Sequence, residues 1–139
     1  MNTIKEISIN KSIINQGFFY GSIVLIICFI LLFITGKLII APFILTLLFL
    51  SVTILRTRHR LIKVFENHIE LRNNFLGPLI LIRNKDFVDY VIKGNKLLIH
   101  YRDYDGTIAT YVILEKKMKK DDFDDFIMIL LAIKENNHV

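Results

Sequence analysis

The feature that most constrains this chain is a pair of uncharged apolar runs in its first part. No charged residue lies between Lys11 and Lys37, and none lies between Lys37 and Arg56. The densest parts are residues 18–35 and 38–55, which are 18 residues each. Because an α-helix rises about 1.5 Å per residue, each run is about 27 Å long as a helix, close to the hydrocarbon thickness of a bilayer. We therefore expect two transmembrane helices.

Two other interpretations of these runs fit the sequence less well. A cleaved signal peptide would need a stronger basic flank and a small-residue cleavage site, and a second apolar run would not follow after only Gly36-Lys37. Two core helices of a soluble domain would need a large surrounding protein, because their faces are apolar all round. The short connection predicts antiparallel helices, a hairpin over residues 17–55. Pro42 is expected to kink the second helix or to lie near its first turn.

Basic residues after the second run predict the orientation of the hairpin. The connection between the runs carries one lysine, whereas the second run is followed by Arg56, Arg58, Arg60 and Lys63. Under the positive-inside rule, this asymmetry predicts a multi-pass protein of the inner (cytoplasmic) membrane with both termini in the cytoplasm. We expect the four basic residues to contact anionic headgroups, each contributing about 1 kcal/mol near the surface. Their place at a helix exit favours lipid over nucleic acid as their partner.

Residues 1–16 precede the hairpin and allow two interpretations. Ile4, Ile7 and Ile14 are spaced as in a short amphipathic helix that lies on the membrane. Ile7 and Ile9, in contrast, alternate as in a β-strand. We prefer the interfacial helix.

Residues 56–139 change from continuous apolar runs to short alternating segments separated by turn residues. These segments predict about six antiparallel strands, at residues 61–66, 69–73, 79–83, 87–93, 96–102 and 107–114. Gly94-Asn95 is typical of a two-residue hairpin. The last segment, from Asp121 to Asn136, has acids in its first turn and an apolar stripe at helical spacing, which predicts an amphipathic helix. The stripe consists of Phe123, Phe126, Ile127, Leu130 and Leu131. We expect an α+β membrane protein in which this helix caps one strongly curved antiparallel sheet.

This order of elements resembles the bacterial PH-like (pleckstrin-homology-like) domains found behind paired transmembrane helices. The resemblance lies in a juxtamembrane strand pair around residues 66–71, a later hairpin arm at residues 96–101 and a closing helix at residues 122–133. The chain departs from such domains in having no tryptophan before Phe87. The resemblance implies a cytoplasmic PH-like domain over residues 56–139 that acts as a binding or scaffold module without catalytic residues.

Two groups of charged residues are candidate binding surfaces. A basic rim for a ligand or partner, of the kind that holds phosphates in phosphoinositide-binding PH relatives, would consist of Arg72, Arg83, Lys85, Lys93 and Lys96. Solubilising charge is the simpler interpretation of these residues. An acidic docking patch for a basic partner would consist of Asp121, Asp122, Asp124 and Asp125. Local charge pairing at a solvated helix start is the more common arrangement of such a cluster.

Motifs for catalysis, cofactors or metals do not emerge from the sequence. His59, His68, His100 and His138 lack the spacing of metal ligands. The segment from Asp103 to Gly106 resembles the start of a calcium loop, but the later acidic ligands are missing and a hairpin turn explains it better. No P-loop or GxGxxG occurs, residues 56–139 contain no serine, and the single cysteine, Cys28, lies in the first apolar run. We expect neither an enzyme nor a cofactor.

The sequence therefore predicts a non-enzymatic integral membrane protein that presents a PH-like binding or scaffold domain at the cytoplasmic face. Its expected partners are the lipid bilayer and another protein, with homo-oligomers as an alternative and nucleic acid excluded. Two other functions fit a small membrane hairpin without a catalytic set. One is an immunity protein that neutralises a toxin, and the other is an accessory subunit of a membrane complex. A neighbouring toxin gene would favour the first of these two.

Overall fold

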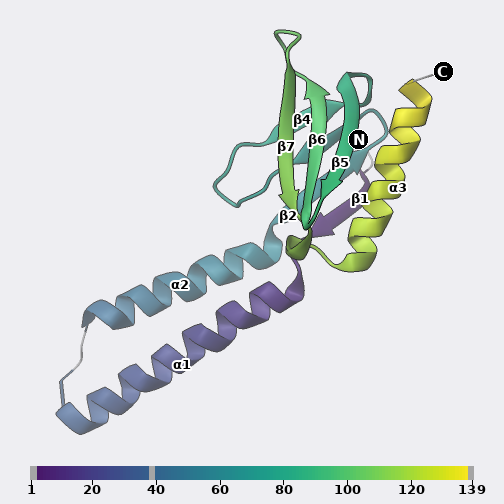
Figure 1. Cartoon of the computed structure of the whole chain (residues 1–139). Helices are drawn as coiled ribbons and strands as arrows, with labels where there is room; N and C mark the ends of the chain where they lie inside the picture. Colours follow the sequence, from purple (N-terminus) through teal and green to yellow (C-terminus); the bar gives the residue numbers. More distant parts are fainter. Residues whose placement is uncertain (1–2, 38–39, 138–139) are drawn as a thin grey trace. The chain divides into compact units, whose positions relative to one another are not determined.

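The computed structural model describes residues 3–37 and 40–137. The chain forms two compact units (Figure 1), which we call the hairpin unit and the β domain. The hairpin unit is residues 11–59. The β domain combines the segment that ends at Asn10 with the segment that begins at Arg60. The β domain is therefore built from chain segments that lie before and after the apolar runs.

The hairpin unit consists of two long helices, α1 (Lys11–Thr35) and α2 (Ile40–Arg58). Both are long and apolar enough to cross a membrane, by length and composition. Helix α1 begins several residues before the predicted run, and residues 38–39 of the second predicted run lie outside the described residues. Pro42 is the third residue of α2, so it lies in the first turn, where its missing N–H removes no helical hydrogen bond.

Helices α1 and α2 pack through small and hydroxyl-bearing side chains. Gly21 is buried, and a Cβ placed on it would lie 2.5 Å from Cδ2 of Leu50. A Cβ placed on Gly17 would lie 2.9 Å from Cγ2 of Thr53. Gly17 and Gly21 are four residues apart, the spacing of a GxxxG pair, which lets two helices approach closely. The buried Thr53 hydroxyl donates to the carbonyl of Phe49 at 2.9 Å, so this polar group is satisfied within its own helix.

Replacing Gly21 by valine is expected to force α1 and α2 apart, since a branched side chain there must displace Leu50. We expect a loss of thermal stability of the detergent-solubilised protein. The matched control is Phe33→Val, because Phe33 is an exposed residue of the same helix. Thermal unfolding followed by circular dichroism at helical wavelengths compares the two variants. Equal melting temperatures for Gly21→Val and Phe33→Val would contradict the close helix contact.

Within the described residues, the β domain contains seven strands in two antiparallel sheets and a C-terminal helix. The first sheet has the order β1-β2-β3-β4 and comprises Thr3–Ser8, Arg60–Phe65, His68–Leu71 and Ile80–Arg83. The second has the order β5-β6-β7 and comprises Phe87–Lys93, Lys96–Arg102 and Ile108–Leu114. Helix α3 is Lys120–Asn137, and two short 3-10 helices, η1 (Asn84–Asp86) and η2 (Glu115–Lys117), join the elements.

These elements confirm an α+β architecture with antiparallel strands and a closing helix. Strands β5 and β6 have the predicted bounds, and Gly94 between them adopts a φ of 59°, as the Gly94-Asn95 hairpin requires. The prediction of one curved sheet is wrong, because β4 and β5 belong to different sheets and η1 separates them. The chain turns there through a 3-10 helix, so the ladder of hydrogen bonds does not continue.

The prediction of an interfacial helix in residues 1–16 is also wrong. Residues 3–8 form strand β1, which pairs antiparallel with β2, with Ile7 opposite Ile62 and Ser8 opposite Arg60. Helix α1 then begins at Lys11. The physical reason is that Ile7 is completely buried in the core of the β domain, where it completes the apolar face that β2 presents. The other interpretation, a β-strand indicated by the alternation of Ile7 and Ile9, describes this segment better.

One hydrophobic core joins the two sheets and α3. The strands contribute Ile7, Leu61, Ile62, Val64, Ile69, Leu71, Ile82, Phe87, Leu97, Ile99 and Ile113. Helix α3 contributes one apolar stripe, namely Phe123, Phe126, Leu130 and Ile133. The predicted stripe of α3 is therefore confirmed but narrower, since Leu131 is exposed. Helix α3 covers the core as the sequence predicts for an amphipathic helix.

An ion pair fixes α3 to the second sheet. Lys134 Nζ donates to Asp89 Oδ1 at 2.7 Å, and the backbone N–H of Tyr90 donates to the same oxygen at 2.7 Å. The hydrogen bond from Lys134 lowers the pKa of Asp89 from its ordinary value of 3.8. Because the folded-state pKa is depressed, the stabilisation is present above pH 3.8 and is lost as the pH falls through the lower folded-state value.

We expect Asp89→Asn to destabilise the β domain by up to about 1 kcal/mol at neutral pH, since the pair is partly exposed. The measurement is the melting temperature of both proteins at a series of pH values. The difference between them should shrink on acidification below about pH 4, where the carboxylate of Asp89 takes up its proton. A difference that stays constant down to pH 2 would rule out this role for the pair.

Candidate functional site

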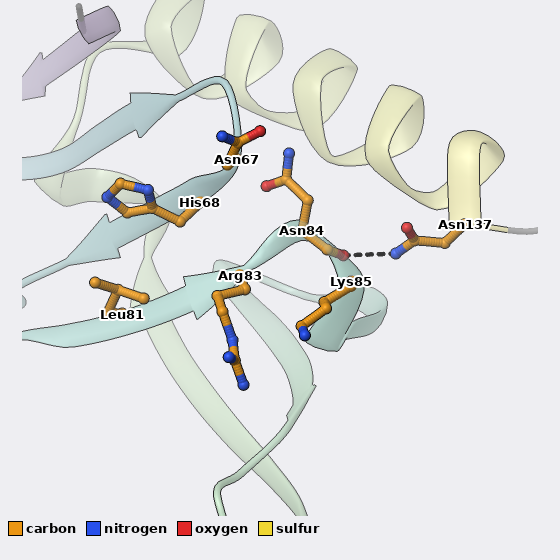
Figure 2. Close-up of a pocket in the computed structure, with 7 residues that line it drawn as sticks. All are labelled: Asn67, His68, Leu81, Arg83, Asn84, Lys85 and Asn137. Atoms are coloured by element: carbon orange, nitrogen blue, oxygen red, sulfur yellow. Dashed lines mark hydrogen bonds between the residues drawn. The ribbon is translucent and has the colours of Figure 1, made fainter. Parts of the chain in front are cut away.

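A groove lies at one end of the β domain, where the β2–β3 turn, strand β4, η1 and the end of α3 meet (Figure 2). Its volume is about 600 Å³, and we call it the amide groove because three asparagines line it. The lining residues are Asn67, His68, Leu81, Arg83, Asn84, Lys85 and Asn137. These come from segments far apart in the sequence, so the groove exists only in the folded domain.

Hydrogen bonds hold the asparagines of the amide groove in place. The N–H of Asn84 donates to the carbonyl of Asn67 at 2.9 Å, and its side-chain Nδ2 donates to the carbonyl of Glu66 at 2.8 Å. Figure 2 shows Asn137 Nδ2 donating to the carbonyl of Asn84, at 2.6 Å. The same nitrogen lies 3.3 Å from the carbonyl of Phe87. The end of α3 is thus tied to η1, and the groove has a fixed wall.

The positive side chains of the groove lie at its rim. Arg83 and Lys85 are exposed, and Arg83 Nε donates to Asp86 Oδ2 at 2.6 Å. The ring of His68 stacks on Phe65, with the centroids 4.4 Å apart and an angle of 11° between the planes. This set offers N–H donors from a lysine, an arginine and amides, which suits carboxylate or carbonyl groups of a partner. It does not pair a nucleophile with a general base.

Only two of the five residues of the predicted basic rim line this groove, Arg83 and Lys85. Arg72 lies at the other end of the β3–β4 ladder, where its N–H donates to the carbonyl of Leu61 at 2.9 Å. Lys93 and Lys96 are exposed and face each other across the β5–β6 hairpin. The sequence could not show that these five residues are spread over the domain, because their positions depend on how the strands pair in space.

The amide side of the groove was not predicted from the sequence. In the sequence, Asn67 lies between two predicted strands, and Asn137 directly follows the predicted last helix. What places them together is the path of α3 back across the domain to η1, which the hydrogen bond between Asn137 and Asn84 fixes. Asparagines at element ends are the one signal that the sequence offered, since their amides often bind backbone groups there.

The four basic residues that follow the second apolar run are divided between the two units. Arg56 and Arg58 are in the last turn of α2, whereas Arg60 and Lys63 are in β2. Both β2 residues lie beside Glu6 of β1, with Arg60 Nε 3.1 Å from Glu6 Oε2 and Lys63 directly opposite Glu6 in the ladder. Contact of all four with headgroups stays a prediction.

The acidic patch at the start of α3 is partly used within the β domain. Lys5 of β1 forms an ion pair with Asp125, and its Nζ lies 3.9 Å from Asp122 Oδ1. Asp121 and Asp124 are exposed. This pairing is not the local one expected at a helix start, because Lys5 comes from a strand that is 120 residues away in the sequence. It ties β1 to α3.

The resemblance of residues 103–106 to a calcium loop is explained by a turn. Asp105 Oδ1 accepts hydrogen bonds from the N–H and the hydroxyl of Thr107, at 3.0 and 2.6 Å. These bonds lower the pKa of Asp105, the hydroxyl of Thr107 having the larger effect. Gly106 has a φ of 83°, which favours glycine. Over residues 3–37 and 40–137 no three His, Cys, Asp or Glu side chains gather as a metal site would require, and His138 lies outside them.

Comparisons with family models, with curated proteins and with solved structures return no match for this chain.

Proposed function

We propose that this protein is a non-enzymatic integral membrane protein whose β domain is a PH-like binding or scaffold module at the cytoplasmic face of the inner membrane. The observation that carries the proposal is that two helices of membrane-spanning length and composition interrupt one β domain between its first and second strands. A hairpin that crosses the bilayer twice returns the chain to the side from which it started. Strands β1 and β2 are then on one side and free to pair.

The arrangement of the β domain supports the PH-like part of the proposal. Antiparallel strands followed by a closing C-terminal helix are the elements that the resemblance implies, and the β domain has both. The proposed binding site is the amide groove, because it combines a rigid polar wall with exposed cations. A protein segment that presents carboxylates or backbone carbonyls is the partner of matching chemistry.

The short connections between the units support a module held at the membrane. Only Ile9 and Asn10 separate β1 from α1, and only His59 separates α2 from β2. The N–H of Asn10 also donates to the carbonyl of Lys117 at 2.7 Å. With two such connections, the β domain stays within a few residues of both helices.

Two measurements on the full-length protein in membranes test this function. The protein should stay in the membrane fraction during an alkaline carbonate wash. A photocrosslinking amino acid at Lys85, in the amide groove, should give a defined protein adduct. The matched control places the same amino acid at Lys93, an exposed lysine outside the groove. Release by carbonate would contradict the membrane part, and equal adducts from both positions would contradict binding in the groove.

A further inference from the structure

The loop that joins β3 to β4, residues 72–79, exposes an apolar tip. We call it the 72–79 loop. Leu76 is 92% exposed, one of the most exposed large apolar side chains of the described residues, and Phe75 and Leu79 are exposed as well. Turn tips are ordinarily built from glycine, proline, asparagine, aspartate or serine. Apolar side chains at such a tip indicate a surface that contacts something other than water.

The geometry of the 72–79 loop is defined. The N–H of Gly77 donates to the carbonyl of Asn74 at 3.0 Å, so Phe75 and Leu76 are the two corner residues of a β-turn. Lys117 Nζ donates to the carbonyl and to the side-chain Oδ1 of Asn73, at 3.1 and 2.7 Å. The loop is thus fixed at its base while its apolar corners point outward.

This loop lies at the end of the β domain from which both helices leave. Its base is next to the start of β2, since Arg72 binds the carbonyl of Leu61, one residue after Arg60. Lys117 links the loop to the other exit, because its carbonyl accepts the N–H of Asn10, the last residue before α1. Both chain exits and the apolar tip therefore share one end of the domain.

We propose that the 72–79 loop inserts Leu76, with Phe75 and Leu79 beside it, into the boundary between headgroups and acyl chains of the bilayer that the hairpin crosses. The proposal rests on the membrane part of the proposed function. A lipid surface is the occupant that the chain itself brings to this end of the domain, because only two residues separate β1 from α1 and only one separates α2 from β2. Apolar side chains at the headgroup boundary are stabilised by the area that they remove from water.

The test uses the full-length protein with Cys28→Ser, which removes the single cysteine, and a new cysteine that carries an environment-sensitive fluorophore. One variant adds Leu76→Cys. The matched control adds Tyr104→Cys, because Tyr104 is 91% exposed and is a corner of a similar turn, in which the N–H of Gly106 donates to the carbonyl of Asp103. That turn joins β6 to β7 at the end opposite to η2, away from Lys117.

Each protein is reconstituted into vesicles of phosphatidylcholine and phosphatidylglycerol, with and without lipids that carry a nitroxide high on the acyl chain. The emission of the Leu76 probe should shift to the blue and be quenched by these lipids. The Tyr104 probe should be quenched only by aqueous iodide. Equal behaviour of the two probes would overturn the proposed insertion.

A probe on the native Cys28, in the middle of α1, separates failure of this inference from failure of the proposed function. Quenching of the Cys28 probe by lipids with a deep nitroxide, together with a Leu76 probe in water, would refute loop insertion and leave the membrane hairpin intact. A Cys28 probe that no lipid quencher reaches would refute both.

Discussion

Ile7→Ala is expected to destabilise the β domain by about 2–4 kcal/mol, although Ile7 lies ahead of both long helices and far in sequence from the other strands. Its side chain is completely buried, opposite Ile62 of β2 and among the core residues of the domain. Truncation to alanine removes three buried carbon atoms and leaves a cavity that the fixed ladder of β1 and β2 cannot close. If residues 1–16 lay on the membrane as a separate helix, the same change would leave the stability of the β domain unaltered.

The measurement is urea unfolding of the full-length protein in detergent micelles, followed by tyrosine fluorescence, since four of the five tyrosines lie in the β domain and the chain has no tryptophan. The control is Ile4→Ala, which makes the same chemical change in the same strand at a side chain that is 62% exposed. We expect Ile4→Ala to change the free energy of unfolding by less than about 0.5 kcal/mol. Similar effects of the two substitutions would show that β1 does not complete the core.

Phe126→Ala is expected to have the larger effect, about 3–5 kcal/mol. Phe126 is the largest completely buried side chain of α3 and lies between Phe123 and Leu130 on the apolar stripe. One hydrophobic core joins both sheets and this helix, so loss of the aromatic ring opens a cavity within that core.

The same unfolding experiment measures this effect, with Met128→Ala as the control. Met128 is on the same helix and is 69% exposed, so its truncation leaves the core unchanged. A domain that kept its cooperative transition and its midpoint after Phe126→Ala would show that α3 does not seal the core. The expected outcome is unfolding at much lower urea concentration, or a domain that is unfolded without urea.

Strands β5 and β6 and helix α3 could be predicted because their signals are local. Gly94-Asn95 marks a hairpin by its turn chemistry, and the bounds of β5 and β6 follow from it. The apolar stripe of α3 follows from helical spacing in the same way. Leu131 was predicted to be buried but is exposed, because helical spacing alone does not define the edge of the stripe.

Strand β1 could not be predicted with the same means. Its isoleucines fit two periods, and Arg60, which forms an ion pair with Glu6 of this strand, is 54 residues further along the chain, beyond both apolar helices. The pairing of β1 with β2 is expected only when the two helices form a hairpin that brings the chain back to β1. The amide groove depends on the same kind of long-range contact, between Asn137 and Asn84, which no local pattern encodes. Gly17 and Gly21 form a GxxxG pair in the sequence, so the expectation that the helices lack this motif is wrong.

The central claim is that one β domain is assembled from chain segments on both sides of a membrane hairpin. Labelling of single cysteines with an impermeant maleimide, in full-length protein with Cys28→Ser, tests it most directly. Cysteines at Ile4 and Tyr104 should react only after the cells are opened, and a cysteine at Lys37, in the connection between the helices, should react in intact cells from which the outer envelope has been removed. Reaction of the Ile4 and Tyr104 positions from opposite sides of the membrane would contradict the claim, because β1 and β2 could then not pair.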